Sequence, residues 1–596
     1  MCGLSGEVRL DGAAADVEAV ARMAAVMEPR GPDGAGVWAS GRVALGHRRL
    51  KIIDLSDRGA QPMVDSDLGL TAVFNGCLYN YPELREELLA EGYRFFSTSD
   101  TEVLVKAYHR WGRDCVDRFK GMFAFAIVER DSGTVVLGRD RLGIKPLYLT
   151  RGGGRIRFAS TLPALLAGGG VDTDLDPVAL HHYMTFHSVV PAPRTILKGV
   201  EKLPPATVRT IPADGGRETD HIYWRPGFTR ASAPGHREMG RAEWSEAVLA
   251  ALRTAVDRRM VADVPVGVLL SGGLDSSLIV ALLAEAGQRD LATFSIGFNA
   301  AGGESGDEFA YSDLVAERFG TDHHQIRIDD ARLLPALTGA VAAMSEPMVS
   351  HDAVAFYLLS QEVSRHVKVV QSGQGADEVF AGYDWYPPLA GVPRGEAADA
   401  YARVFFDRPH EELKGILNPD RLLGRDAAAE FVRAHFAEPG ADTAVDAALR
   451  LDTTVMLVDD PVKRVDNMTM AWGLEARTPF LDHDLVELAA ACPPELKLAS
   501  DGKGVLKDAA RGVVPDEVID RTKGYFPVPA IRHLSGPYLD LVREALEAPA
   551  AKARALYRPE YLERLLAAPS DHRTTLGASQ LWQVALLELW LQSHGV

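Results

Sequence analysis

Hydrophobic and polar positions divide the chain into two regions with different periodicities. In the first 200 residues, short segments of β-type composition or alternation are punctuated by glycine and proline, a pattern that predicts strands joined by turns, with two helical insertions. The predicted strand segments are 41–54, 70–76, 122–130, 134–140 and 145–150. This region is therefore expected to form a β-rich domain.

From about residue 243 the pattern changes to apolar strands that alternate with helices. A helical period over 244–261 precedes a continuously apolar run at 264–270, which is typical of a buried parallel strand. Further strands are predicted at 292–298 and 367–373, and further helices at 276–287 and 309–320. This repetition predicts a parallel α/β sheet, followed beyond residue 400 by a mainly helical region.

A stretch rich in glycine, proline and charge, without periodicity, separates the two regions. We therefore divide the chain into a domain at 1–208, a linker at 209–242 and a second domain at 243–596. A length of 596 residues is too great for one ordinary core, which agrees with this division.

Composition narrows the classes of function. Hydrophobic residues make up 47% of the chain and charged residues 24%, as in globular proteins, and the net charge of −18 argues against non-specific nucleic-acid binding. No run of about 18 uncharged apolar residues appears and no secretory signal is visible, so we expect no membrane span and a cytoplasmic protein. The cysteines lack CxxC spacing, which argues against a zinc site and a disulfide framework; they are Cys2, Cys77, Cys115 and Cys492.

The strongest local signal is the loop SGGLDSS at 271–277, between a predicted strand and a predicted helix. Its glycines let backbone amides approach an anion, and the helix N-terminus adds a positive dipole end. The spacing is neither that of a Walker loop nor GxGxxG. Asp275 would repel a bare phosphate unless it holds a bridging divalent cation. A serine-capped helix after a tight turn is the structural alternative.

A second glycine-rich loop, SGQGADEVFAGY at 372–383, follows another predicted strand. Loops at the carboxyl ends of neighbouring parallel strands face one crevice, so this loop and the first are expected to meet. We assign Asp275 and Asp377 as Mg²⁺ ligands, because Mg²⁺ prefers hard oxygen donors that it shares with phosphates. For Asp377 and Glu378, a solvated acidic turn is the alternative.

These motifs resemble a known family. SGGLDSS is similar to the pyrophosphate-binding loop of ATP pyrophosphatase synthetases, and MCGLSG, RGPDG, FNGCLYNYPELR and SDTEV resemble class II glutamine amidotransferases. Together, from residue 1 to roughly 530, the chain resembles the glutamine-dependent asparagine synthetase family. The resemblance implies an α/β multidomain fold. Its N-terminal part would be an Ntn-hydrolase αββα sandwich, and its C-terminal part a parallel-sheet ATP-pyrophosphatase domain with a helical end.

The resemblance gives a role to the cysteine behind the initiator methionine, which by itself could be chance. Removal of Met1 would leave Cys2 with a thiol and an α-amine, whose usual pKa of about 7.7–8.0 suits a general base. The thiolate would attack the glutamine amide, with Asn75 and the Gly76 N–H as oxyanion hole. The residues implied for glutamine binding are Arg49 (α-carboxylate), Asp100 (α-amine), Leu50, Ile52, Asn75 and Gly76. For the two charged residues, surface charges are the alternative.

In the second domain the resemblance implies adenylation of an acceptor carboxylate by ATP, release of pyrophosphate, and displacement of AMP by ammonia passed internally. Mg²⁺ would assist, and segment 462–489 would form a helical wall of the site. Lys507 and Lys523 are candidates to stabilise phosphate charge; Lys523 is the better one and is assigned as catalytic, with a solvated lysine as the alternative. The implied ATP contacts are Leu270, Ser271, Gly272, Gly273, Asp275, Ser276, Ser277, Ile296, Ser372, Gly373 and Gln374.

The sequence departs from the family pattern in three places. Gln374 replaces the glutamate of SGEGxDE, Cys77 replaces the glutamate of NGEIYN, and the acceptor segment reads EPMVSHDAVAFYLLS at 346–360. This combination resembles a branch that amidates N-acetylglutaminylglutamine, and Gln374 and His351 are its suspected selectivity residues.

Aspartate, as in asparagine synthetase, is the alternative acceptor. An inactive binding or regulatory protein on the same scaffold and a β-lactam-type cyclase remain open. The expected partners are small molecules, without nucleic acid or membrane. The oligomeric state is open, with a homodimer as one candidate.

Overall fold

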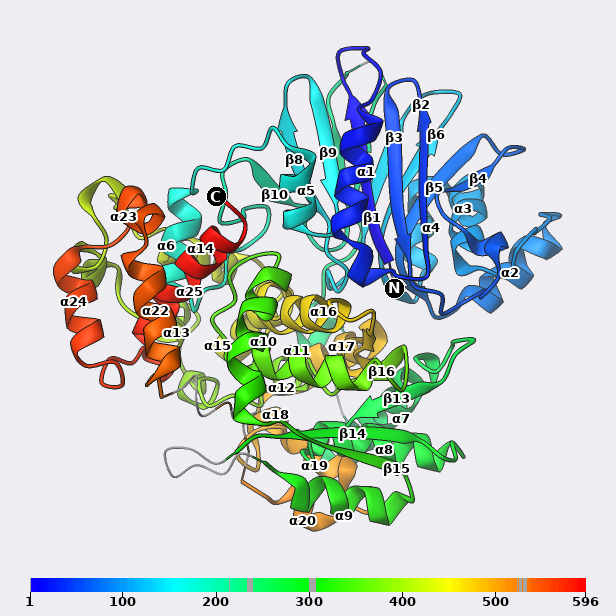
Figure 1. Ribbon diagram of the computed structural model, residues 1–596. Helices are drawn as coiled ribbons and strands as arrows, with labels where there is room; N and C mark the ends of the chain where they lie inside the picture. The colour runs from blue at the N-terminus through cyan, green and yellow to red at the C-terminus, as the bar shows by residue number, and fades with distance from the viewer. Residues whose placement is uncertain are drawn as a thin grey trace.

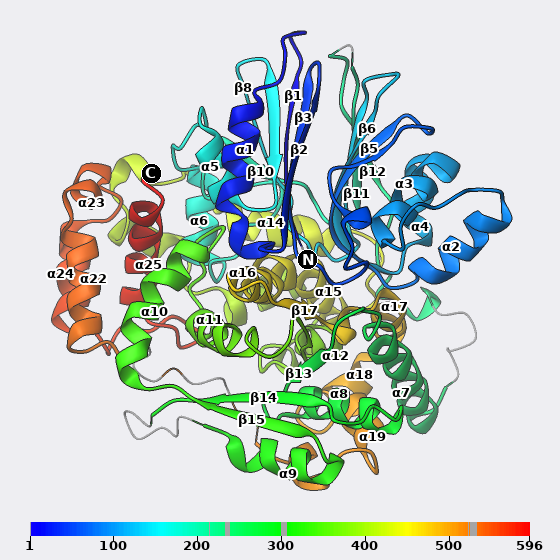
Figure 2. The same ribbon diagram turned by 45° about the vertical axis from the view of Figure 1, so that its right-hand side comes forward.

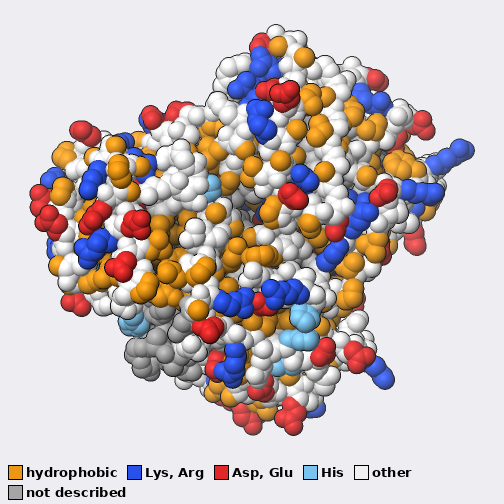
Figure 3. All heavy atoms as spheres, viewed as in Figure 1, with side chains coloured by type: hydrophobic (Ala, Val, Ile, Leu, Met, Phe, Trp, Pro, Cys, Tyr) orange, Lys and Arg blue, Asp and Glu red, His pale blue; other side chains and the backbone are white. Residues whose placement is uncertain are grey.

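The structure is a computed structural model that describes residues 2–213, 215–232, 239–299, 307–522, 524, 528 and 533–596. Two β-sheets stand upright in the N-terminal part, above a parallel sheet and a large group of helices (Figure 1). On the face shown in Figure 3, Lys and Arg side chains are interspersed with Asp and Glu.

The first sheet contains the N-terminal strand near its centre. Its order is β10–β8–β9–β1–β3–β2, and every pair is antiparallel. The strands are β1 (Cys2–Arg9), β2 (Gly34–Ser40), β3 (Val43–Arg49), β8 (Tyr148–Gly152), β9 (Arg155–Ala159) and β10 (Val200–Lys202).

The second sheet has the order β12–β11–β7–β6–β5–β4 and is also antiparallel. Its strands are β4 (Met63–Asp65), β5 (Leu70–Leu78), β6 (Gly121–Glu129), β7 (Val135–Arg139), β11 (Thr207–Ile211) and β12 (Thr219–Ile222). β11 lies partly and β12 wholly within the predicted linker at 209–242, so the start of that segment belongs to this sheet. The domain boundaries themselves stay a prediction.

The two sheets pack face to face, and helices cover their outer faces (Figure 2). The inner faces share an apolar cluster that includes Leu4, Leu45, Val73 and Ala126. Helices α1 (Val17–Val26) and α5 (Leu162–Gly168) cover the first sheet; α2 (Tyr81–Ala90), α3 (Asp100–Trp111) and α4 (Cys115–Arg118) cover the second. The predicted αββα sandwich is confirmed.

The C-terminal part contains a parallel sheet in the order β15–β14–β13–β16–β17. Successive strand residues face opposite sides. Thus Val268 and Val369 pack with α7 (Arg241–Arg258) and α8 (Leu274–Glu285), whereas Leu269 and Val370 pack with α10 (Asp330–Ala343) and α11 (Asp352–Val363). The strands are β13 (Val266–Leu269), β14 (Ala292–Gly297), β15 (Asp322–Arg327), β16 (Val369–Gln371) and β17 (Glu475–Arg477). Helices on both faces of a parallel sheet confirm the predicted α/β architecture.

Most of the chain beyond residue 400 is helical, as predicted, although segment 462–489 is not helical throughout. That segment holds α16 (Lys463–Met470) and α17 (His483–Ala491), but β17 lies between them as an edge strand of the parallel sheet. The other α-helices of the described residues are α6 (Pro177–Thr185), α9 (Phe309–Phe319), α12 (Ala376–Phe380), α13 (Ala397–Phe405), α14 (Ala427–Ala437), α15 (Ala444–Leu451), α18 (Pro494–Leu498), α19 (Gly504–Ala510), α20 (Asp516–Ile519), α22 (Pro537–Glu547), α23 (Pro549–Arg554), α24 (Pro559–Ala567) and α25 (Gln580–Ser593). Among the described residues, none of the helices has the length and apolar character needed to cross a membrane.

Candidate active sites

The first candidate site is a small cavity around Cys2. Cys2 begins β1 and pairs directly with Arg49 at the end of β3, while β5 brings Asn75 and Gly76 to the same point. The backbone nitrogen of Cys2 donates a hydrogen bond to Asn75 Oδ1 at 3.1 Å. The Cys2 side chain is buried, and burial raises the pKa of its thiol. Residues that line the cavity include Cys2, Arg49, Leu50, Ile52, Gly76 and Asp100, so the structure brings the predicted glutaminase residues together.

Asn75 and Gly76 hold the strand geometry beside Cys2. The Asn75 Nδ2 donates to Ser160 Oγ at 3.4 Å, so both ends of this amide are engaged. A Cβ atom at Gly76 would lie only 2.2 Å from the carbonyl oxygen of Met122, so only glycine allows β5 to approach β6 this closely. Their assignment to an oxyanion hole stays a prediction.

The two predicted charged contacts to glutamine are buried. The guanidinium of Arg49 donates to the carbonyl oxygens of Ser56 at 2.8 Å and of Asp54. Asp100 Oδ2 accepts the Leu78 N–H at 3.1 Å, and burial raises the pKa of Asp100 to about 6. Neither residue is a solvated surface charge, which removes that alternative for both.

One wall of the Cys2 cavity comes from the other domain. Glu475, on β17, lines the cavity together with Cys77. Arg477 Nε donates to Glu475 Oε1 at 2.6 Å, and its Nη2 lies 3.7 Å from Cys77 Sγ. Burial raises the pKa of Glu475, but the adjacent cations, Arg477 among them, lower it further, to about 2. An ionised acid therefore borders the cavity although position 77 lacks one, and the sequence analysis missed it.

A buried ion cluster ties Cys2 to helix α16. Arg30 Nε donates to the backbone oxygen of Cys2 at 3.3 Å, and Arg30 Nη1 pairs with Asp466 Oδ2 at 2.9 Å. Lys145 Nζ contacts the other oxygen of Asp466 at 3.1 Å. All three side chains are no more than 6% exposed, so this contact between the sandwich and the C-terminal part excludes water.

The second candidate site is the pair of glycine-rich loops at the carboxyl ends of β13 and β16. Gly272 has a φ of +74° and lies against Tyr311 and Ser312 on α9, where a Cβ atom would clash. Ser271 Oγ and Ser276 Oγ lie 3.1 Å apart and brace the turn. Gly273 is the N-cap of α8, so the amides of the first helical turn face the loop.

The two loops touch, as predicted. A Cβ atom at Gly373 would lie 3.0 Å from the Cβ atom of Asp275 and 3.1 Å from the backbone nitrogen of Ser276. Leu270 and Ile296 are buried at the ends of β13 and β14, and Ser372 is buried at the start of the second loop. The residues predicted to bind ATP thus surround one edge of the sheet, although their contacts with ATP stay predictions.

Lys503 lies between the two predicted metal ligands. Its Nζ is 2.7 Å from Asp275 Oδ2 and 2.8 Å from Asp377 Oδ1. Burial lowers the pKa of Lys503, but the two carboxylates raise it more, so the ammonium stays charged well above neutral pH. Lys507, which the sequence analysis named instead, donates to the backbone oxygen of Ser500. Lys523 lies outside the described residues.

Next to this group, burial and the neighbouring Asp377 raise the pKa of Glu378 to about 7. The Tyr383 hydroxyl donates to Glu378 Oε1 at 2.7 Å. Glu378 is therefore a buried, hydrogen-bonded carboxyl, and the predicted alternative of a solvated acidic turn does not apply to it. Gln374 and His351 are both partly buried.

The N-terminal αββα sandwich begins with a cysteine, and the parallel sheet of the C-terminal part carries two glycine-rich loops suited to bind phosphate. Together these two sites define a two-site amidotransferase. Family models agree: "Glutamine amidotransferase domain" matches residues 1–224 and "Asparagine synthase" matches residues 247–592. The chain belongs to the glutamine-hydrolysing asparagine synthetase family, and it is a glutamine-dependent carbon–nitrogen ligase.

Curated relatives match almost end to end. Asparagine synthetase [glutamine-hydrolyzing] 1 of Bacillus subtilis is 31% identical, over 99% of this chain and 96% of its own length. A putative asparagine synthetase of Mycobacterium bovis is 32% identical over 99% and 97%, and amidase chry2 of Gibberella zeae is 28% identical over 85% and 84%. A solved PRPP amidotransferase from B. subtilis matches with a TM-score of 0.31 and 15% identity over 55% of this chain and 90% of its own, a similarity too low to bear on the argument.

Proposed function

We propose that this enzyme hydrolyses glutamine at Cys2 and passes the ammonia to an acyl-adenylate made at the two glycine-rich loops. Glutamine and water give glutamate and ammonia. The acceptor carboxylate and ATP give acyl-AMP and pyrophosphate, and ammonia then displaces AMP to leave an amide. We propose N-acetylglutaminylglutamine as the acceptor. Every residue invoked below belongs to one chain, so the proposal holds for a monomer or a homodimer.

The observation that carries the proposal is the Cys2 cavity. A thiol, a guanidinium and a carboxyl converge there within a buried space, which suits a zwitterionic amino acid with an amide side chain. The nitrogen of Cys2, fixed by Asn75 Oδ1, becomes the α-amine once Met1 is removed, and it then serves as the base for the adjacent thiol. Because burial raises the thiol pKa, this base has a proton to remove at neutral pH.

The residues at the loops fit a nucleotide phosphate with a hard cation. Ser277 Oγ, at the N-terminus of α8, is buried and has no hydrogen-bond partner among the described residues, and a bound phosphate would satisfy it. Asp275 and Asp377 both direct an oxygen at the ammonium of Lys503, which supports their proposed role as shared Mg²⁺ ligands. Mg²⁺ would neutralise phosphate charge, and Lys503 would remain beside it as a second cation.

The acceptor proposal rests on the sequence around the second loop. Gln374 is a neutral amide where the family pattern has a carboxylate, and His351 precedes α11 in the altered acceptor segment. Loss of an acid near the acceptor suits an N-acetylated dipeptide, which has a carboxylate but no ammonium group, better than aspartate, whose ammonium group an acid would pair with. The curated relatives are named as asparagine synthetases, so aspartate is the second candidate.

Pyrophosphate release with ATP, Mg²⁺ and ammonia, measured in parallel with N-acetylglutaminylglutamine and with aspartate, tests the acceptor. Release with the dipeptide alone supports the proposal, whereas release with aspartate alone makes the enzyme an asparagine synthetase. Silence with both, under conditions in which glutamine is still hydrolysed, would refute both acceptors. Silence together with absent glutaminase activity would favour an inactive scaffold.

Cys2→Ala tests the nucleophile. We expect glutamine-dependent synthesis to be abolished while ammonia-dependent synthesis stays at the wild-type rate. Cys115→Ala is the matched control, because Cys115 is a buried cysteine on α4 in an apolar cluster that does not contain Cys2. Equal loss of both activities in Cys2→Ala would contradict the role given to Cys2.

A further inference from the structure

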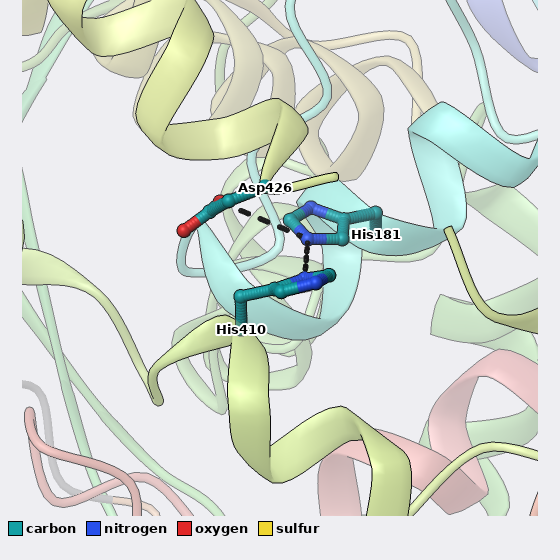
Figure 4. A group of neighbouring side chains, drawn as sticks. All are labelled: His181, His410 and Asp426. Carbon is teal, nitrogen blue, oxygen red and sulfur yellow. Dashed lines mark hydrogen bonds and ion pairs between the residues drawn. The ribbon is translucent and has the colours of Figure 1, made fainter. Parts of the chain in front are cut away.

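A group of metal-binding side chains lies away from both candidate active sites. His181, His410 and Asp426 come from three separate segments, and their ligand atoms all lie within 4.8 Å of one another (Figure 4). His181 is on α6, His410 begins the 3₁₀ turn His410–Gly415, and Asp426 is the N-cap of α14. The chain between them spans more than 240 residues, so the fold, not local sequence, creates this group.

The tautomer of His181 is set by its neighbour Thr185. The Thr185 hydroxyl donates its hydrogen to the backbone oxygen of His181 at 2.7 Å. The 3.3 Å contact between Thr185 Oγ1 and His181 Nδ1 must therefore be a hydrogen bond donated by Nδ1. A proton on Nδ1 leaves a lone pair on Nε2. A hydrogen-bonded second nitrogen of this kind is the usual companion of a metal-ligating histidine.

The lone pair of His181 faces the other two side chains. His181 Nε2 lies 2.9 Å from His410 Nδ1 and 3.8 Å from Asp426 Oδ1. In a tetrahedral zinc site with bonds of about 2.0–2.1 Å, neighbouring ligand atoms lie about 3.3 Å apart. The two histidine nitrogens would need to separate by about 0.4 Å and the carboxylate to approach by about 0.5 Å, shifts that side-chain rotations supply.

The electrostatic surroundings suit a cation. His181 is buried, and its Nε2 faces the carboxylate of Asp426 at 3.8 Å. The guanidinium of Arg425, next to Asp426 in the chain, pairs with Glu430. His410 and Asp426 are partly exposed, which gives solvent access to a fourth coordination position.

A second group of potential metal ligands is already paired with arginine side chains. The ligand-type atoms of Asp482, His483 and Asp484 also lie within 4.8 Å of one another. However, Asp482 pairs with Arg259 at 2.9 Å, and Arg258 bridges Asp482 and Asp484 at 3.1 and 2.6 Å. A metal ion would have to displace these guanidinium groups. In the first group no guanidinium contact among the described residues has to be displaced. The hydrogen bond between the two histidines has to be exchanged, and Asp426 Oδ1 also accepts the Ala429 N–H at 3.0 Å as the cap of α14.

We propose that His181, His410 and Asp426 form a binding site for a divalent transition metal, with Zn²⁺ as the cation to test, and with water as the fourth ligand. Two imidazole nitrogens and one carboxylate oxygen form a donor set that zinc accepts. The cysteine spacing argues against a zinc site in the sequence, but this group contains no cysteine and is outside the reach of that argument. The metal would link α6, the 3₁₀ turn and the start of α14, so its role is structural.

The experiment is a titration of EDTA-treated, full-length protein with Zn²⁺ alone by calorimetry, with metal content measured after dialysis. It is done in a Cys2→Ala background, so that the thiol cannot bind zinc. We expect one Zn²⁺ per chain with a Kd below 1 µM and a higher Tm when zinc is bound. Co²⁺ should give the visible absorption bands of a tetrahedral site.

Asp426→Asn is the decisive variant, because asparagine preserves the helix cap but is a weaker metal ligand. We expect it to weaken Zn²⁺ binding at least tenfold without lowering the Tm of the metal-free protein. Asp420→Asn, an exposed carboxylate six residues earlier, is the matched control and should bind Zn²⁺ as well as the parent.

Thr185→Val keeps the shape of the side chain but removes the hydroxyl that accepts from His181. A positioning role predicts about 10–100-fold weaker Zn²⁺ binding. The proposal is overturned if the parent binds no Zn²⁺ at 10 µM free metal. It is also overturned if His410→Gln, Asp426→Asn and Asp420→Asn all retain one tightly bound ion.

Discussion

The ammonium of Lys503 holds two carboxylates that we assign to Mg²⁺, and this arrangement makes a quantitative prediction. The Lys503 side chain is 10% exposed and those of Asp275 and Asp377 are 21% exposed. Removing one partner of a buried ion pair costs about 3–5 kcal/mol. Because both carboxylates keep some solvent, we take the lower end, about 3 kcal/mol, as the cost of Lys503→Met.

Mg²⁺ should restore most of the stability that Lys503→Met loses, whereas a change of pH should not. A cation that binds only the folded state at 100 times its Kd stabilises by about 2.7 kcal/mol, nearly the amount lost. The pKa of Lys503 is raised in the folded protein, so its contribution is complete below the unfolded lysine pKa of about 10.4 and would be lost only above that. The stability difference between wild type and variant should therefore be constant from pH 7 to 9.

The assay is thermal unfolding of wild type and Lys503→Met in EDTA and in excess Mg²⁺. At about 2 °C per kcal/mol, the variant should unfold about 6 °C lower in EDTA and recover most of that difference in Mg²⁺. Lys507→Met is the control, because Lys507 contacts only a backbone oxygen among the described residues, and it should change the Tm by less than about 2 °C. A variant that is destabilised but gains no more from Mg²⁺ than wild type would refute a shared cation site at these carboxylates.

Three further predictions concern the sandwich and its contact with the second domain. Because the pKa of Asp100 is about 6, its carboxylate becomes protonated as the pH falls, and the KM for glutamine should rise about tenfold from pH 7 to pH 5. Asp100→Asn should raise the KM at pH 7 and remove this pH dependence. A pH profile of KM that the substitution leaves unchanged would contradict the role of Asp100. Gly76→Ala places a Cβ atom 2.2 Å from the Met122 oxygen and should lower the free energy of unfolding by about 1–3 kcal/mol. Gly152→Ala is the control, because no atom lies within 4 Å of its Cβ position, and it should leave the stability unchanged. Equal denaturant midpoints for the two variants would refute the predicted clash. Asp466→Asn removes the charge that pairs with two buried cations and should lower the free energy of unfolding by about 3–5 kcal/mol. The variant should also slow glutamine-dependent synthesis more than ammonia-dependent synthesis. Equal slowing of both would argue against a role of Asp466 in holding Cys2.

Most of the fold could be predicted from periodicity, because the strands and helices that build the cores are long and apolar. The run at 264–270 contains β13, and the segments at 70–76 and 122–130 overlap β5 and β6. The segment predicted as a linker contains most of β11 and all of β12, two strands that periodicity did not predict. Residues of β11 and β12 carry weak alternation. The burial of β11 depends on β7, with which it pairs across about 70 residues of sequence, and β12 is largely exposed.

The candidate sites could be predicted where a local motif marks them and not where only tertiary contacts create them. Cys2, Gly76 and the SGGLDSS loop are marked by the sequence itself. Lys503 is not marked, because only the folded chain brings its ammonium 2.7 Å from Asp275, which lies 228 residues earlier. Glu475 was missed for a similar reason: a strand of three residues with two charges has no hydrophobic pattern, and its burial comes from the domain contact.

Strand β17 is the element that joins the two sites physically. The backbone oxygen of Arg477 accepts the Ser372 N–H at 2.8 Å, at the start of the second glycine-rich loop. The side chain of the same residue reaches Cys77, next to Gly76 in the Cys2 cavity, and pairs with Glu475 on the cavity wall. Because the side chains of β17 are no more than 1% exposed where they form this pair, they cannot move independently of their neighbours. A displacement of the second loop that moves β17 must therefore also move the wall of the glutamine cavity.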